Sequence, residues 1–374
     1  MRTKTSLSFV LGSLALSLAV GCTPTDGSDD YDPALLAEYR TALPDAERLM
    51  AAAPEASVMN LVGDPALYPN ASYDIIVGIN GAVTGVVQLL DTIGSVEPTL
   101  YNSATGEFFW GPWENDDGAG YVAAYIREAA PGSDFRFEYA FMRGTDNDLA
   151  NMRPIVWGAA SPDPNNDDHG VGLTVWDFEA DYQFEVDFGN GGANNDRGRF
   201  ATLWAQGPDE NEPEATVSII VAVFRDFVPQ DSPGAEPADL DYLFGRFAMD
   251  GQAIDFIDWE ADMDVSEPVD GLAESVGVRM VFLNEGAGRA EADATGGSLA
   301  VGDSWNGVEC WDNAIDRTYL NFEVTGSQPA SYTEGELVGC DLFQATLAES
   351  NVPSLQDLPA EIYNGLIELA EGGL

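Results

Sequence analysis

The stretch Ser72–Val96, SYDIIVGINGAVTGVVQLLDTIGSV, indicates the architecture of the whole chain. It carries no charge between Asp74 and Asp91, and its apolar residues recur every three or four positions, which is the periodicity of a helix. Pro98 prevents this helix from continuing. A helix that is apolar on most of its surface needs other elements around it, so the stretch predicts a central core helix.

Three glycines, Gly78, Gly81 and Gly85, lie within this helix. Each costs about 1 kcal/mol of helix propensity relative to alanine, so close packing against another element must return that free energy. Gly81 and Gly85 resemble a dimerisation motif of membrane helices. However, the uncharged run Ile75–Leu90 has 16 residues, fewer than the roughly 20 needed to span a bilayer. We therefore expect a core helix and not a membrane span.

The chain after this helix has a different pattern. From Glu107 to Val324, short apolar or alternating runs are separated by turn residues, which is typical of strands joined by hairpins. No helix of ordinary length separates most of these runs, so the sheet should be antiparallel. The predicted strands are Glu107–Trp113, Tyr121–Glu128, Phe135–Arg143, Ile155–Ala159, Val171–Phe178, Arg199–Gln206, Thr216–Phe227, Leu243–Met249, Ile254–Trp259, Val276–Leu283, Arg289–Thr295 and Thr318–Val324.

These elements predict a mainly β, α+β fold. A closed barrel or a two-sheet sandwich would not need a long apolar helix, whereas one wide, curved sheet would hold it in its concave face. We expect a large antiparallel meander or half-barrel, with residues 34–374 forming a single β-rich domain. Terminal helical segments are predicted at Ala34–Ala53, Asp341–Glu349 and Pro359–Glu371.

The N-terminus is typical of a lipoprotein signal peptide. Two basic residues precede the apolar run Leu7–Val20, and small residues then lead to Cys22. We expect residues 1–21 to be removed, Cys22 to be lipidated and residues 22–33 to form a polar tether. Thr23 after the cysteine favours the outer membrane, at its periplasmic face or at the cell surface. The alternative is an ordinary signal peptide with a coincidental cysteine.

The chain is strongly acidic, with 64 acidic and 15 basic residues. Removal of residues 1–21 takes away Arg2 and Lys4, which leaves a net charge of 13 − 64 = −51 and no lysine. Such a charge repels nucleic acid and anionic lipid headgroups and is typical of proteins adapted to salt. We expect no nucleic-acid partner and a membrane contact through the lipid anchor.

Two further cysteines, Cys310 and Cys340, indicate a disulfide, because an even pair in an exported chain is usually oxidised. Closing this loop of 30 residues would stabilise the fold by roughly 3–4 kcal/mol. Metal binding is the weaker alternative, since neither cysteine has a second cysteine or a histidine nearby.

The region around Cys310 carries a family resemblance. Gly286–Ala292, then Gly296-Gly297, Glu309–Asp312 and Arg317–Tyr319, resembles a pattern in uncharacterised lipoproteins of myxobacteria and their relatives. That family implies no established activity. The expected architecture is also similar in shape to the Lol-type lipoprotein carriers and receptors, whose half-barrels hold acyl chains.

The shape similarity implies a ligand site between the helix and the sheet. Ile79, Val83, Val86 and Leu90 would line it, and an apolar or lipid ligand would occupy it. The alternative is a core that is simply filled. The first function hypothesis is therefore a non-enzymatic, outer-membrane-anchored lipoprotein that binds such a ligand.

The acidic hairpin loops support a second hypothesis, a cell-surface module that binds glycan or calcium. Asp163, Asn165 and Asp167 have the alternate spacing that begins a calcium loop, although Asp168 occupies the position where glycine would make the turn. Calcium is the one possible cofactor that the sequence suggests. Tryptophans on the predicted strands could stack on sugar rings or fill the core.

An enzymatic role has weaker support. His169 is the only histidine, and it lies in a polar loop, whereas a Ser-His-Asp triad needs a buried and oriented ring. Paired carboxylates could hydrolyse glycosides, but no spacing motif identifies a pair. The sequence does not decide whether the protein is an enzyme, and it favours a non-enzymatic role.

Overall fold

The computed structural model describes residues 31–44, 49–52, 65–115, 118–188, 196–208, 216–230, 232–249, 251–265, 270–283 and 286–372. Within these residues the chain forms one 15-stranded sheet in which every strand pairs with its neighbours in the sequence. All pairs are antiparallel, as between β10 and β11 or β13 and β14. The predicted fold class, a curved antiparallel meander with terminal helices, is confirmed.

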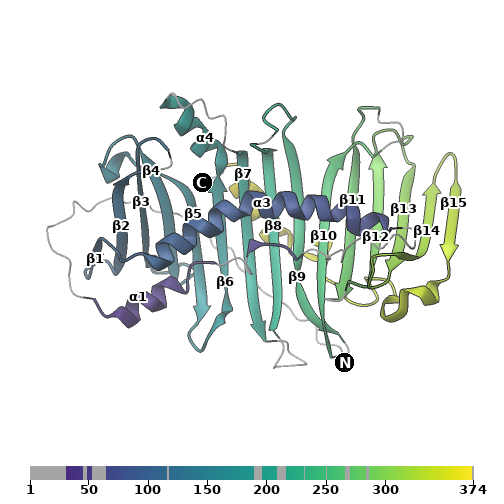
Figure 1. Cartoon of the computed structure of the whole chain (residues 1–374), viewed down its shortest axis with the longest axis horizontal. Helices are drawn as coiled ribbons and strands as arrows, with labels where there is room; N and C mark the ends of the chain where they lie inside the picture. The colour runs from purple at the N-terminus through teal and green to yellow at the C-terminus, as the bar shows by residue number, and fades with distance from the viewer. Residues whose placement is uncertain are drawn as a thin grey trace.

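The strands are long in the middle of the sheet and short at its two edges (Figure 1). Their bounds are β1 Leu100–Asn102, β2 Glu107–Glu114, β3 Tyr121–Glu128, β4 Phe137–Gly144, β5 Arg153–Asp163, β6 Asn166–Asp177, β7 Arg197–Pro208, β8 Thr216–Val228, β9 Ala238–Met249, β10 Gln252–Met263, β11 Glu274–Leu283, β12 Gly288–Gly296, β13 Ser304–Trp311, β14 Arg317–Thr325 and β15 Ala330–Gly335.

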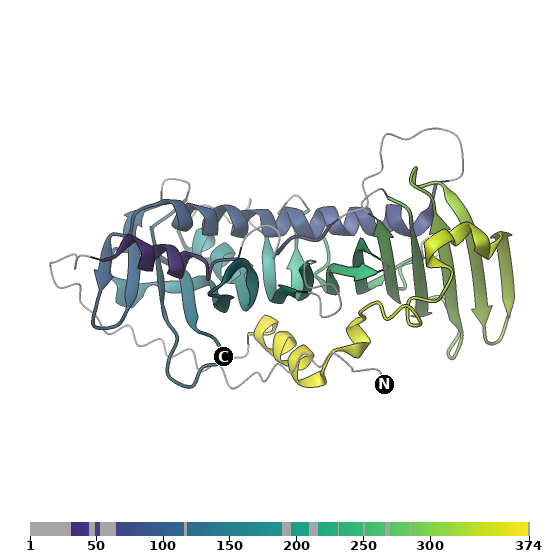
Figure 2. The ribbon, with the colours of Figure 1, turned by 90° about the horizontal axis from the view of Figure 1, so that it is seen from below.

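Helix α3, Leu67–Ser95, lies across the strands on one face of the sheet (Figures 1 and 2). Its 29 residues make it about 43 Å long. Trp259 Nε1 of β10 donates to Ser72 Oγ at 3.0 Å, and the ring of Trp176 in β6 lies beside Gly85. The helix therefore runs from the later strands towards the earlier ones. No helix in the described residues is long and apolar enough to cross a membrane.

The helix starts at Leu67, five residues before its predicted start, because a distant strand caps it. The carboxylate of Glu309 in β13 accepts hydrogen bonds from the backbone N–H groups of Leu67 (2.7 Å) and Tyr68 (2.9 Å). Arg317 Nε of β14 donates to the same carboxylate at 2.8 Å. A negative charge at these unpaired N–H groups stabilises the first turn. No local cap could have indicated this start.

The C-terminal part of the chain covers the opposite face of the sheet (Figure 2). It contains η2 (Leu337–Phe343), η3 (Leu355–Asp357) and α5 (Ala360–Ala370). Side chains alternate between the two faces along each strand. In β11, for example, Met280 packs in the core under α3 and Val281 packs in the core of the opposite face.

Several sequence predictions were wrong in detail. Helix α1 covers Pro33–Arg40, with Asp32 as its N-cap, and residues 45–48 and 53 of the predicted segment Ala34–Ala53 lie outside the described residues. In place of the predicted helix at Asp341–Glu349, η2 ends at Phe343 and is broken at Asp341, which has a positive φ of 46°. The sequence analysis also missed α4, Phe178–Asp187. The remaining missed elements are β1, β13, β15 and two short 3₁₀ helices, η1 (Leu149–Asn151) and η3.

The predicted disulfide between Cys310 and Cys340 is present. It joins β13 to η2, and both cysteines are buried. The bond therefore fixes the start of the C-terminal segment against the later strands of the sheet.

Candidate functional site

Helix α3 divides the face of the sheet that it covers into two flanks. Strands β4, β6, β8 and β10 end at the edge of the sheet nearest α4, and we call this the α4 edge (Figure 1). Helix α4 is held there by ion pairs from the buried Arg143 of β4 to Asp181 (2.7 Å) and Glu185 (2.5 Å). The two flanks differ in chemistry.

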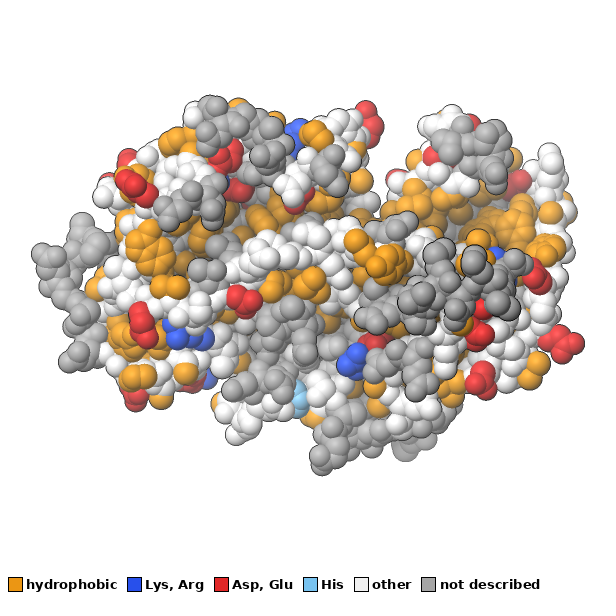
Figure 3. Space-filling view, viewed as in Figure 1, with side chains coloured by type: hydrophobic (Ala, Val, Ile, Leu, Met, Phe, Trp, Pro, Cys, Tyr) orange, Lys and Arg blue, Asp and Glu red, His pale blue; other side chains and the backbone are white. Residues whose placement is uncertain are grey.

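The flank of α3 towards the α4 edge is apolar. Six large, partly exposed side chains pack against the core on the α3 face, and each lies in the half of its strand nearest the α4 edge. Figure 3 shows hydrophobic side chains gathered along this side of the helix, its upper side in the view. We call this set the α4 flank: Phe141, Trp176, Phe227, Leu240, Met263 and Trp305.

Trp176 connects the α4 flank to the helix. A Cβ atom at Gly85 would lie 3.0 Å from Trp176 Cη2, so the glycine leaves room for the indole beside α3. The ring stacks on Phe178 with 4.1 Å between centroids. Its Nε1 atom is buried and has no hydrogen-bond partner in the part of the chain that the structure describes. The α4 flank thus holds an unsatisfied donor among apolar side chains.

The other flank of α3 is polar and covered. Asn80 of α3 exchanges two hydrogen bonds of 2.9 Å with the backbone of Ala51, which fastens the N-terminal segment to the helix. On the same sheet face, Arg246 of β9 forms an ion pair of 2.8 Å with the buried Asp255 of β10. Helix α1 lies along this side of α3 (Figures 1 and 2). An apolar ligand is therefore better matched by the α4 flank.

The residues predicted to line a ligand site lie under the helix and not beside it. Ile79, Val83 and Leu90 are at most 3 % exposed and belong to the core between α3 and the sheet. The side chain of Val86 lies outside the described residues. Among these positions the structure therefore shows core packing. The sequence analysis missed the α4 flank because its members are scattered over strands that only the fold aligns.

The core under α3 also contains a buried hydroxyl. Tyr242 of β9 is fully buried, and its hydroxyl has no hydrogen-bond partner within the described residues. Burial raises the pKa of Tyr242 well above its ordinary value. An unsatisfied buried hydroxyl costs about 1–3 kcal/mol, which the packing of the surrounding core must offset.

The predicted calcium loop forms the hairpin between β5 and β6. Asp163 Oδ1 accepts hydrogen bonds from the backbone N–H of Asn165 (2.8 Å) and from its side-chain Nδ2 (3.1 Å). The side chain of Asp167 lies outside the described residues. No group of three acidic, histidine or cysteine residues suited to a metal ion occurs in the described residues. Turn formation accounts for Asp163 and Asn165, and calcium binding remains a hypothesis.

The other candidate residues take structural positions. His169 lies in β6 beside Asn166, whose side-chain amide is 3.1 Å from the imidazole Nε2. Trp110, Trp204 and Trp259 are almost completely buried, so they fill the core. Cys22 and the predicted signal peptide lie outside the described residues.

A group of acidic residues lies on the opposite face of the sheet, beneath the C-terminal segment. Burial raises the pKa values of Asp258, Glu260 and Asp293 above their ordinary values. Asp258 accepts a hydrogen bond of 2.8 Å from the backbone N–H of Leu355. A two-carboxylate hydrolase needs pKa values that diverge within the pair, whereas these three shift in the same direction.

Fold and site together define the class of this protein: an open antiparallel β-meander spanned by one apolar helix with an apolar flank. No protein-family model, curated protein or solved structure significantly matches the chain. The functional assignment therefore rests on the chemistry of the chain itself.

Proposed function

We propose that this protein is a non-enzymatic lipoprotein, anchored in the outer membrane through Cys22, that binds an acyl chain along the α4 flank. The observation that supports the proposal most strongly is the alignment of six partly exposed apolar side chains on one side of α3. Contiguous apolar surface of this kind marks sites of interaction with ligands, membranes or other proteins.

The shape of the α4 flank favours an extended chain over a compact ligand. It reaches from Phe141 in β4 to Trp305 in β13, which are nine strand intervals apart, or about 43 Å at ~4.8 Å per interval. It is narrow, because α3 borders it on one side and the sheet ends on the other.

The decisive experiment measures binding of a dansyl-labelled fatty acid to the secreted chain that begins after Cys22. Met263→Asp places a charge in the α4 flank at the last residue of β10, and we expect it to weaken binding about tenfold or more. Val338→Asp is the matched control, because Val338 is 67 % exposed in η2, which is bonded to the end of β13 farthest from the α4 flank.

Equal effects of the two substitutions would contradict acyl-chain binding along the α4 flank. Native mass spectrometry before and after solvent extraction gives an independent measurement. An extractable mass of lipid size that disappears in the Met263→Asp variant supports the proposal. A lipid mass that is unchanged in this variant would place the ligand elsewhere, and binding of a protein but no lipid would make the α4 flank a protein interface.

The anchor is tested separately. Metabolic labelling with an alkyne fatty acid should modify the full-length chain and should fail to modify the Cys22→Ala variant. Labelling that persists in the variant would contradict anchoring through Cys22.

A further inference from the structure

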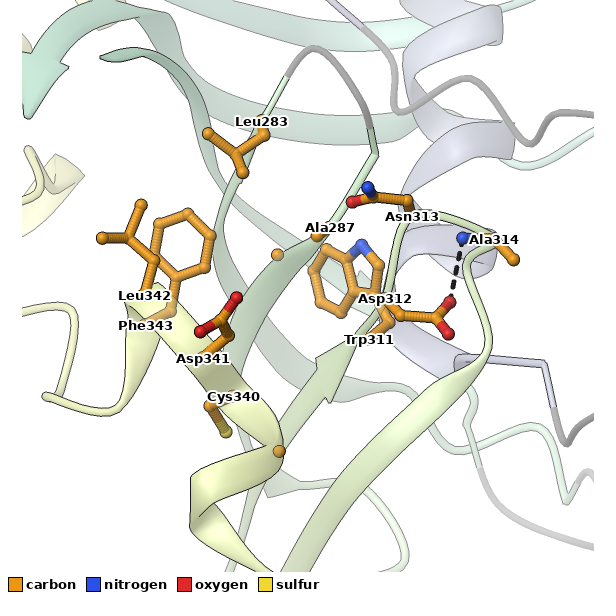
Figure 4. Close-up of a pocket in the computed structure, with 12 residues that line it drawn as sticks. Leu283, Ala287, Trp311, Asp312, Asn313, Ala314, Cys340, Asp341, Leu342 and Phe343 are labelled. Atoms are coloured by element: carbon orange, nitrogen blue, oxygen red, sulfur yellow. Dashed lines mark hydrogen bonds between the residues drawn. The ribbon is translucent and has the colours of Figure 1, made fainter. Parts of the chain in front are cut away.

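A second site lies at the ends of β11, β12 and β13, next to the disulfide. It is a pocket of about 440 Å³. Leu283 at the end of β11, Ala287 and Gly288 at the start of β12, the turn after β13 and η2 line it (Figure 4). Leu283, Trp311, Leu342 and Phe343 give it apolar walls, and none of the residues that line it is basic. This pocket is separate from the α4 flank, which ends at the opposite ends of these strands.

The acidic residue of interest in the pocket is Asp341. Figure 4 shows its carboxylate between the rings of Phe343 and Trp311. In the described residues, no hydrogen bond or ion pair engages this carboxylate, whereas Asp312, the other acid of the pocket, accepts from the backbone N–H of Ala314 at 2.9 Å. Asp341 is therefore the acid that is available to a ligand.

The backbone holds Asp341 in place from both sides. Cys340, directly before it, is bonded to Cys310 of β13. Two residues after Asp341, the carbonyl oxygen of Phe343 accepts a hydrogen bond of 3.1 Å from Arg289 Nη1 of β12. Between these two fixed points Asp341 has φ 46° and ψ −113°, a conformation that non-glycine residues rarely adopt. The carboxylate is thus carried on a rigid, strained support.

We propose that this pocket binds a small organic cation, such as an alkylammonium group. Its positive charge would lie at the Asp341 carboxylate, and its alkyl groups would contact Trp311 and Phe343. Aromatic rings attract such cations through their quadrupoles. The mature chain's expected net charge of −51 also raises the local concentration of cations. An anion would meet an unpaired carboxylate and is disfavoured.

Calorimetric titration of the full-length protein in a non-ionic detergent tests this assignment. Tetramethylammonium is the probe, and tert-butyl alcohol is a neutral comparison compound of similar size. We expect the cation to bind and the alcohol to bind at least about tenfold more weakly. Asp341→Asn should weaken binding of the cation by about tenfold, because asparagine keeps the shape and tolerates positive φ but removes the charge.

Glu323→Gln is the control, because it removes an exposed carboxylate of β14 that does not line the pocket, and it should change the affinity less than about twofold. Failure of tetramethylammonium to bind, equal binding of the alcohol, or equal losses in the two variants would each overturn the proposal. The comparison of cation with alcohol uses the unaltered protein, so it decides the question even if Asp341→Asn does not fold.

Discussion

At the scale of single residues, Glu309 joins three parts of the molecule that are distant in the sequence. Its side chain is fully buried, accepts from the first N–H groups of α3 and pairs with Arg317. A buried carboxylate is costly unless it is paired and hydrogen-bonded. Glu309 meets both conditions, so the start of α3 depends on a single side chain of β13.

Glu309→Gln should therefore destabilise the fold strongly. The amide nitrogen cannot accept a hydrogen bond, and Arg317 would lose its buried partner. We expect a loss of about 3 kcal/mol in the free energy of unfolding, measured by urea denaturation. Glu334→Gln is the control, because Glu334 is the more exposed partner of Arg317 at 3.3 Å, and its loss should be under about 1 kcal/mol. Similar losses in both variants would refute the role given to Glu309.

Asp258 should make stability depend on pH. Burial raises its pKa above the ordinary 3.8, so the folded state binds the proton more tightly than the unfolded chain does. The resulting stabilisation is complete below about pH 4 and is lost as the pH rises through the folded-state pKa. In Asp258→Asn this contribution is absent, while an acceptor for the Leu355 N–H is kept.

The wild-type protein should thus lose stability relative to Asp258→Asn as the pH rises from 4 to 7. Urea denaturation of both proteins at several pH values measures this difference. Glu323→Gln, which removes an exposed carboxylate of β14, is the comparison. A difference that is constant with pH, or that matches the one for Glu323→Gln, would contradict the prediction.

At the scale of elements, two glycines of α3 allow the effect of helix propensity on stability to be measured apart from the effect of side-chain packing. A Cβ at Gly81 would meet nothing within 4 Å, whereas one at Gly85 would lie 3.0 Å from Trp176. Gly81→Ala should stabilise the fold by about 0.5–1 kcal/mol. Gly85→Ala should gain less, because the indole must shift. Thermal denaturation of both variants measures the difference, and equal gains would show that Trp176 does not require the glycine.

The sequence predicts elements well where the signal is local. The three-to-four periodicity of Ser72–Val96 and the alternation of most strands depend on neighbouring residues alone. Strand β13 was not predicted, and it contains the dipeptide Asn306-Gly307, which is common in turns. In the structure, a side chain at Gly307 would collide with the Tyr68 hydroxyl of α3. The glycine therefore allows the helix to pack closely against β13. This contact is non-local and leaves no pattern in the sequence.

The ligand hypothesis shows the same limit. The apolar residues of the helix could be identified, but their burial under the helix could not be distinguished from exposure beside it. The α4 flank takes one residue from each of six strands, and the direction of every strand decides which end lies near α4. The disulfide could be predicted because it depends on residue type and export. Strand β15 lacks an apolar pattern because nearly all its residues are exposed.

At the scale of the whole molecule, charge repulsion should make stability depend on salt. The mature chain's expected net charge is −51, and dissolved ions screen repulsion between exposed charges. Screening also weakens exposed ion pairs, but these contribute only about 0–1 kcal/mol each. Relief of repulsion should dominate.

At pH 7 we expect the midpoint of thermal unfolding to rise by about 5 °C between low salt and 1 M NaCl, which corresponds to ~4 kcal/mol for a chain of this length. At pH 4, where more carboxylates are protonated, the rise should be smaller. A midpoint that falls with salt at pH 7 would show that the ion pairs outweigh the repulsion.

Because the order of strands in the sheet is the order in the chain, the sheet can grow during synthesis, each new strand adding to the one made just before it. Helix α3 has no such advantage. It is made before every strand, yet its cap Glu309 is synthesised 242 positions after Leu67. The nascent chain therefore carries an apolar helix whose docking surface is still incomplete, and a chain interrupted before β13 would retain that helix without its cap. Such fragments should aggregate or require a chaperone, which makes completion of translation itself a condition for a soluble product.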